Sequence, residues 1–270
     1  MSRSFDGVDD VINCGSSTSL DDLGPLSIGA WINIISAGEN GFGAIWLKGD
    51  SSDSAGSKYF ANSGVGQLAI LFWITKAAGD QLQRTASTQL NASTWTFVHM
   101  TWDGSNDFNN IHIYYNLSEV SYASASNASS IPSDAAFNLG IGNDPASGTQ
   151  TFDGSIAHVQ TWNRVLSVNE MAQAMRFPGS ITRGLIGFWP LWGGSPEPDY
   201  SGKGNSGTVT GALVSNINPP INRVFGYKRP RLKYYSSTAV VSASLNTKIS
   251  VLGSTKVSTL LSTKLKVLNT

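Results

Sequence analysis

The feature that most constrains the fold of this chain is a series of short β-type segments separated by turn residues. In "LSIGAWINI" (26–34) the apolar residues alternate, with Trp31 on the side opposite the isoleucines. "QLAILFWIT" (67–75) is a continuous apolar run, which suits a strand that is buried on both faces. "TWTFVHMTWDGSNDFNNIHIYYN" (94–116) predicts two strands around the turn Asp103-Gly104-Ser105.

The pattern continues toward residue 180 and includes one helix. Further strands are expected at 137–144 and 152–166. Ser167 is a suitable N-cap, Glu170 completes a capping box three residues later, and Pro178-Gly179 ends the helix. Many short strands with one short helix predict an all-β fold, an antiparallel β-sandwich.

The composition supports a packed β-domain and excludes some other classes. Charged residues make up 13% of the chain and aromatic residues 10%, including 8 Trp, so apolar surface for a core is ample. The single Cys14 excludes a disulfide within the chain. No apolar run reaches the roughly 18 residues of a membrane helix, and we expect no ordinary secretion signal in the opening "MSRSFDG".

A net charge of zero conceals an uneven distribution. Residues 1–199 contain 18 acids and 8 bases, a net charge of −10, whereas residues 200–270 contain no acid and 10 bases. The basic part could pack on the acidic body of the same molecule, or it could bind an acidic partner. Nucleic acid is the least favoured partner, because the bases are spread out and no recognition-helix pattern accompanies them.

The last third of the chain differs from the rest. Residues 181–217 are rich in Gly and Pro but contain Trp189 and Trp192, so we expect them to pack on the sandwich of residues 1–180. Residues 218–270 begin as a basic connector and end in three copies of an eight-residue unit, "TKISVLGS", "TKVSTLLS" and "TKLKVLNT". An even repeat rich in β-branched residues predicts a β-repeat extension, not a coiled coil.

We expect this C-terminal region, 218–270, to serve as an anchor. Its charges are densest in "YKRPRLKYY", and the residues proposed to contact a partner are Lys228, Arg229, Arg231, Lys233, Tyr234 and Tyr235. The partners considered are sister subunits, with a trimer assumed, and other proteins of a particle.

Five phrases, in this order, resemble one known family. They are "SFDGVDDVIN", "LSIGAWINI", "STWTFVHMTWDG", "IHIYYN" and "FDGSIAHVQTWNRVLSVNEMAQ". Over residues 4–177 the chain resembles a laminin-G-like domain of the concanavalin A-like lectin/glucanase superfamily. The resemblance implies a jelly roll of two antiparallel sheets. The position of "GLIGFWPLWGG" after the helix, with the basic repeats behind it, is similar to proteins of tailed phages and related viruses.

The sequence lacks the residues that a glucanase of this superfamily needs. Glycoside hydrolysis requires two carboxylates across a cleft, and the superfamily's enzymes carry them as Glu-x-Asp-x-(x)-Glu on one strand. No such string occurs, and the chain has four Glu, at positions 39, 119, 170 and 197. We expect no catalytic residues and no enzyme. The three histidines, His99, His112 and His158, are expected to be structural.

Calcium is the one ion that the resemblance suggests as a ligand. Asp6, Asp9 and Asp10 could supply hard oxygen ligands, although Asp-Gly turn chemistry accounts for them equally well. Related domains often place a calcium-binding Asp in the phrase Ile-Asp-Glu-Val, where this chain has Ala157. We therefore expect no metal site and no cofactor, with calcium at the three aspartates as the alternative.

Carbohydrate binding is the function that the resemblance most readily suggests. Sugars stack on exposed aromatic rings, and the candidates near loops are Trp46, Tyr59, Trp73 and Tyr122. The strand tryptophans at 31, 95, 102 and 162 are expected to fill the core instead.

Two functions follow from these observations. The first is a non-enzymatic structural protein at a virion surface, such as a capsid decoration, head fibre or tail component, that displays a lectin-like sandwich. The alternative is a secreted or cell-surface carbohydrate-binding module. Neither requires a membrane-spanning segment or nucleic acid.

Overall fold

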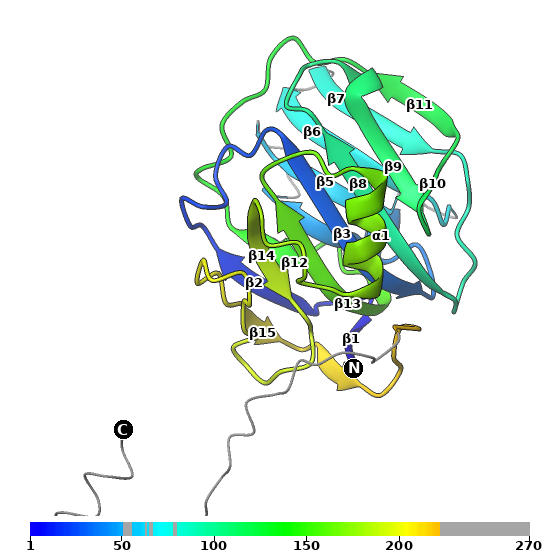
Figure 1. The fold of residues 1–270 in the computed structure, drawn as a ribbon, viewed down its shortest axis with the longest axis vertical. Helices are drawn as coiled ribbons and strands as arrows, with labels where there is room; N and C mark the ends of the chain where they lie inside the picture. Colours follow the sequence, from blue (N-terminus) through cyan, green and yellow to red (C-terminus); the bar gives the residue numbers. More distant parts are fainter. Residues whose placement is uncertain (51–55, 63, 65–66, 78–79, 222–270) are drawn as a thin grey trace, which may run out of the picture. The chain divides into compact units, whose positions relative to one another are not determined.

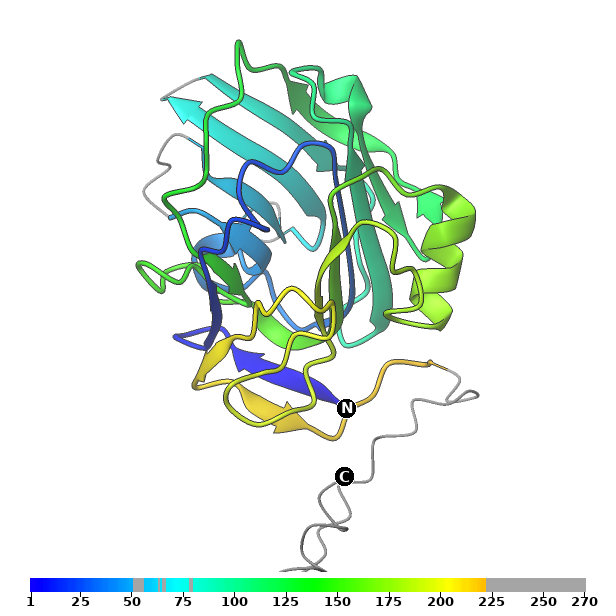
Figure 2. The ribbon, with the colours of Figure 1, turned by 60° about the vertical axis from the view of Figure 1, so that its left-hand side comes forward.

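The structure is a computed structural model, and it describes residues 1–50, 56–62, 64, 67–77 and 80–221. Two eight-stranded sheets pack face to face (Figures 1 and 2). Every strand pair is antiparallel, which confirms the predicted all-β sandwich. The predicted anchor, 218–270, lies outside the described residues from position 222 onward.

The first sheet, called sheet A, has the order β10-β9-β8-β3-β13-β1-β16, with β14 paired to β13. Its strands are β1 (Ser2–Asp6), β3 (Leu26–Ile34), β8 (Trp95–Trp102), β9 (Ile111–Tyr115), β10 (Ser118–Glu119), β13 (Asp153–Trp162), β14 (Leu185–Trp189) and β16 (Leu213–Ser215).

The second sheet, called sheet B, has the order β11-β7-β6-β5-β4-β12-β2-β15. Its strands are β2 (Val11–Gly15), β4 (Ala44–Lys48), β5 (Lys58–Asn62), β6 (Ile70–Ala77), β7 (Asp80–Ala86), β11 (Tyr122–Ser126), β12 (Leu139–Ile141) and β15 (Thr208–Thr210). Two short 3₁₀ helices, η1 (Glu39–Gly41) and η2 (Phe108–Asn110), lie in the connections.

The core lies between the two sheets and follows the period-2 pattern of the strands. In β3, Ile28 and Ile32 point into this core, whereas Trp31 belongs to a separate cluster on the outer face of sheet A. The same alternation in β6 sends Phe72 inward and Trp73 outward. Burial of each large apolar side chain contributes about 1.5–3 kcal/mol, so this pattern fixes which face of each strand is internal.

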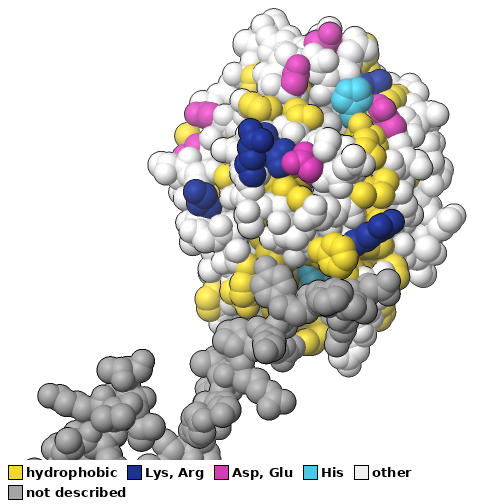
Figure 3. Space-filling model, in the orientation of Figure 1, with side chains coloured by type: hydrophobic (Ala, Val, Ile, Leu, Met, Phe, Trp, Pro, Cys, Tyr) yellow, Lys and Arg dark blue, Asp and Glu magenta, His cyan; other side chains and the backbone are white. Residues whose placement is uncertain are grey.

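Helix α1 (Val168–Arg176) covers the outer face of sheet A (Figure 2). The predicted capping box is present: the Ser167 hydroxyl accepts from the Glu170 N–H, and the Ser167 N–H donates to the Glu170 carboxylate at 2.9 Å. Met171 and Ala174 pack against Trp162. Charged side chains on the face of the molecule that carries α1 are few and scattered (Figure 3).

Residues 185–215 contribute strands to both sheets, so they do more than pack on the sandwich as the sequence predicts. In this stretch β14 and β16 extend sheet A, and β15 extends sheet B. A buried ion pair, Arg3 Nε to Glu197 Oε2 at 2.9 Å, joins the stretch to β1. Among the described residues, no helix is long and apolar enough to cross a membrane.

Candidate functional site

The structure places the four predicted aromatic residues in three different environments. Trp46 is fully buried in the core between the sheets, and its register partner Phe60 lies in the same core. A ring in that position offers no face to a ligand, so the prediction that Trp46 contacts a sugar is wrong.

Tyr122 lies apart from the other aromatic candidates, in β11 beneath the Arg84 guanidinium, whose central carbon is 3.5 Å from the ring centroid. Its hydroxyl donates to Glu119 Oε1 at 2.8 Å and accepts from the Ile113 N–H at 3.0 Å. Burial raises the pKa of Tyr122, so the hydroxyl stays protonated. These contacts hold Tyr122 in a polar network at the sandwich edge.

Tyr59 and Trp73 are neighbours on the outer face of sheet B. They are register partners of β5 and β6, and their rings stack with centroids 5.0 Å apart and an interplanar angle of 24°. Tyr59 is only 1% exposed, and its hydroxyl donates to the Asp50 carbonyl. The prediction of Tyr59 as a sugar contact is therefore wrong. Its role is to support the half-buried Trp73, which also contacts Phe42.

A row of polar side chains on β7 lies beside Trp73 on the same face. Gln83 is the register partner of Trp73, and Gln81 and Thr85 flank it two residues away. Gln81 Nε2 donates to Gln83 Oε1 at 2.9 Å, and Gln83 Nε2 donates to Thr85 Oγ1 at 2.7 Å. The alternation of "DQLQRTA" next to the Trp73 strand is the signal that sequence reasoning missed.

We call this surface the Trp73 face; its residues are Phe42, Trp73, Thr75, Gln81, Gln83 and Thr85. None of these side chains carries a charge. Among the residues that the structure describes, the buried atoms Trp73 Nε1 and Thr75 Oγ1 have no hydrogen-bond partner. A half-buried aromatic ring next to side-chain amides is suited to binding a ligand with both C–H and hydroxyl groups.

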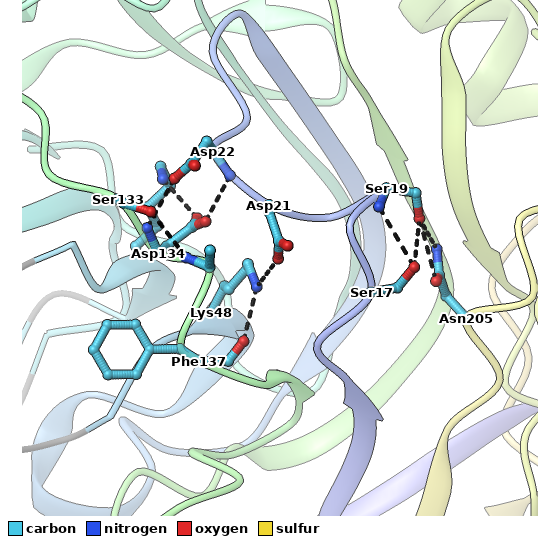
Figure 4. Close-up of polar contacts among 11 residues, drawn as sticks. Ser17, Ser19, Asp21, Asp22, Lys48, Ser133, Asp134, Phe137 and Asn205 are labelled. Carbon is cyan, nitrogen blue, oxygen red and sulfur yellow. Dashed lines mark hydrogen bonds and ion pairs between the residues drawn. The ribbon is translucent and has the colours of Figure 1, made fainter.

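A second candidate is a cleft of about 410 Å³ at one end of the sandwich. We call it the 18–25 cleft; it is lined by Thr18, Ser19, Asp21, Asp22, Leu23, Gly24, Pro25, Asn163, Ile186 and Lys203. Figure 4 shows the polar network behind Asp21 and Asp22, the two carboxylates of this lining. It includes Lys48 and Asp134, both buried.

The sequence and the fold can now be compared with known proteins. A family model described as the concanavalin A-like lectin/glucanases superfamily, of the laminin-G 3 type, matches residues 6–172. The chain belongs to this superfamily. No curated protein matches the sequence.

Solved structures of the superfamily's fold are similar at low sequence identity. A candidate carbohydrate-binding protein from Bacteroides ovatus superposes with a TM-score of 0.59 and 16% identity over 82% of this chain; the match spans 61% of that protein's length. A heptameric SAP-like pentraxin from Limulus polyphemus superposes with a TM-score of 0.51 and 14% identity, covering 80% of this chain and 95% of the pentraxin. These likenesses establish the fold.

Each of the four glutamates of this chain has a structural partner. Glu170 caps α1 and pairs with Arg164 at 2.6 Å. Glu197 pairs with buried Arg3, Glu119 contacts His112, and Glu39 accepts from Thr151. Each of the four lies in a different part of the fold.

The candidate calcium ligands of this chain are Asp6, Asp9 and Asp10. One ligand atom from each lies within 4.8 Å of the others. Asp10 Oδ2 accepts from the Asp6 N–H, and Asp6 Oδ1 accepts from the Val8 N–H, both at 2.9 Å. These bonds belong to the turn between β1 and β2. The superfamily's other ligand position, Ala157, is buried against Trp31 and Phe97.

Two of the three histidines, His99 and His158, are buried among aromatic rings. His99 is fully buried between Phe97 and Trp162, and burial lowers its pKa from 6.5 to about 3. His158 is buried beside Phe188 and Trp192, and burial lowers its pKa to about 3 as well. Both are therefore neutral at physiological pH. The predicted anchor residues, from Lys228 to Tyr235, lie outside the described residues.

Proposed function

We propose that this chain is a non-catalytic carbohydrate-binding protein that binds neutral glycans through the Trp73 face. The observation that carries the proposal is the position of Trp73, half-buried on an outer sheet face, stacked on Tyr59 and beside Gln83. The superfamily, which includes lectins, supports the proposal. So does the fold shared with a candidate carbohydrate-binding protein from Bacteroides ovatus.

The chemistry of sugars matches this surface. The C–H face of a pyranose ring packs on an aromatic ring, and its hydroxyls need nearby donors and acceptors. Trp73 supplies the ring, and the Gln81 and Gln83 amides supply both kinds of polar atom. Because the Trp73 face has no charged side chain, a neutral glycan suits it better than a sialylated or sulfated one.

The test is a glycan array, followed by affinity measurements on the best neutral polysaccharide. Trp73→Ala should weaken binding about tenfold or more, because it removes the stacking surface. Trp192→Ala is the matched control, since Trp192 packs near His158 and Tyr200 on sheet A and should bind as wild type. Unchanged binding by Trp73→Ala, or no glycan bound at all, would refute the proposal.

A structural role in a virus particle is the second candidate. It is supported by the basic region from residue 200 to 270, which has 10 bases, no acid and three eight-residue repeats. In that role the sandwich is displayed outward at the virion surface, and Lys228, Arg229, Arg231, Lys233, Tyr234 and Tyr235 contact sister subunits or other virion proteins.

Mass spectrometry of particles purified from cells that encode the chain separates the two settings. Recovery of the protein in stoichiometric amounts with capsid or tail proteins would support the virion role. Its recovery from the cell surface or the medium, and not from particles, would place the carbohydrate-binding module outside a virus.

A further inference from the structure

We propose that the 18–25 cleft is a second ligand site, which takes one neutral, hydroxyl-rich ring of monosaccharide size. The proposal extends the proposed function to a second surface, and its test separates the two. The cleft volume of about 410 Å³ lies in the usual range for small-molecule sites, roughly 300–1,000 Å³.

One wall of the cleft consists of hydrogen-bond acceptors that the protein holds in place. Asp21 Oδ1 accepts from Lys48 Nζ at 3.0 Å, and the same fully buried ammonium donates to the Phe137 carbonyl at 2.7 Å (Figure 4). Among the described residues, the second oxygen of Asp21 has no hydrogen-bond donor. Because the carboxylate is already oriented, a ligand would pay little to order it.

Asp22 is fixed by a reciprocal pair of bonds to the buried Asp134. The Asp22 N–H donates to Asp134 Oδ1 at 2.7 Å, and Asp22 Oδ1 accepts from the Asp134 N–H at 3.0 Å. A hydrogen bond from the Ser133 side chain lowers the pKa of Asp22. Asp134 in turn pairs with the buried Lys58 at 2.6 Å. The exposed Asp22 carboxylate is thus an ionised acceptor at the cleft.

The other residues of the lining include hydrogen-bond donors and apolar groups. Asn163 and Lys203 are exposed, and among the described residues Lys203 forms no ion pair. Leu23 and Ile186 are buried apolar residues that can contact C–H groups. A hydroxyl group both donates and accepts, so a ligand rich in hydroxyls can bond to the carboxylates and to the donors at once.

The balance of charge favours a neutral ligand over an ion. Lys48 pairs with Asp21, and Lys58 pairs with Asp134. These pairs leave Asp22 and Lys203, one charge of each sign, in the lining. A cationic ligand would meet Lys203, and an anionic one would meet the carboxylates, whereas hydroxyls gain charge-assisted bonds from both.

The experiment is isothermal titration of the full-length protein with four sugars. These are the methyl glycosides of glucose, galactose, mannose and N-acetylglucosamine. We expect at least one to bind, and Asp22→Asn to weaken it about tenfold through loss of a charge-assisted bond. Asn tolerates the left-handed φ of 50° at this position, so the variant should keep the loop.

Further variants make the assignment specific to the cleft. Asn163→Ala should weaken binding about fivefold. Asp9→Asn, in the exposed turn between β1 and β2, is the matched control and should bind as wild type. Trp73→Ala should keep glycoside binding, so a failure of the proposed function and a failure of this site give different results.

Several outcomes would overturn the proposal. They are no binding by any of the four glycosides, or wild-type affinity in both Asp22→Asn and Asn163→Ala. Loss of glycoside binding in Trp73→Ala would assign the sugars to the Trp73 face instead. Glucosamine is titrated in the same way as a cationic comparison. Its tighter binding than the glucose glycoside would indicate an amine site and contradict a neutral ligand.

Discussion

The outer faces of the two sheets differ in how they are covered. On sheet A, Trp162 is fully buried beneath α1, and Trp31 donates to the Met175 carbonyl of that helix at 3.2 Å. Within the described residues, no α-helix covers the outer face of sheet B. There Trp73 is half-buried beside the Gln81 and Gln83 amides. The same alternation of strand residues thus serves packing on one sheet and, as we propose, recognition on the other.

The comparison assigns different roles to chemically identical side chains. Trp162 and Trp73 are both outward-facing strand tryptophans, but one contacts a helix and the other contacts Tyr59 and Phe42. If the assignment is right, mutations on sheet A should change stability, and mutations on the Trp73 face should change binding.

The largest effect is expected for Trp162→Ala. Removing this fully buried ring leaves a cavity under α1, and truncation of a buried Trp typically costs about 3–5 kcal/mol of the free energy of unfolding. Urea unfolding should show a loss of this size for Trp162→Ala and a loss below about 2 kcal/mol for Trp73→Ala. Equal losses in the two variants would break the comparison.

Acid should destabilise the protein through the two buried histidines of sheet A, His99 and His158. The folded-state pKa of His99 is about 3, below the unfolded value of 6.5, so the unfolded chain binds more protons as the pH falls. Stability is therefore retained above pH 6.5 and lost between pH 6.5 and 3. For His99 the loss should be about 2 kcal/mol by pH 5.

The measurement is the free energy of unfolding in urea at pH 7 and at pH 5. His99→Leu should reduce the difference between the two pH values by about 2 kcal/mol, because this variant cannot take up the proton. A variant with the wild-type pH dependence would show that His99 is not the group responsible.

A pair of glutamines on opposite faces sharpens the comparison further. Gln160, under α1, accepts from the Gly179 N–H at 2.7 Å, and its loss leaves that buried donor unpaired. Gln160→Ala should cost about 1–2 kcal/mol of stability without changing glycan affinity. Gln83→Ala should weaken glycan binding about fivefold with little change in stability. The opposite pattern of losses would place glycan binding on sheet A instead of sheet B.

The smallest effect concerns the N-cap of the helix that covers sheet A. Ser167→Ala removes the hydroxyl that accepts from the Glu170 N–H and should cost about 1 kcal/mol. Urea unfolding measures this loss, and Ser167→Asp, which keeps a capping acceptor, should restore most of it. If Ser167→Ala leaves the free energy of unfolding unchanged, packing of α1 alone holds the helix in place.

The strands and the helix were largely predictable, because they depend on local pattern. The period-2 alternation of 26–34 places Ile28 and Trp31 on opposite faces, as the structure has them. The Ser167 and Glu170 spacing identifies the capping box. The site was less predictable, because Trp46 and Trp73 both occur in continuous apolar runs whose inner and outer faces look alike.

The sequence by itself determined the all-β sandwich, the superfamily and the capped helix, because turn residues and alternation act over a few neighbouring positions. Only the tertiary structure decided which tryptophan is available to a ligand, since strand register and the placement of α1 set the cover over each sheet face. It also decided contacts between distant residues, such as Arg3 with Glu197 and Asp22 with Asp134. Such contacts depend on how the sheets pack, and no local pattern encodes them.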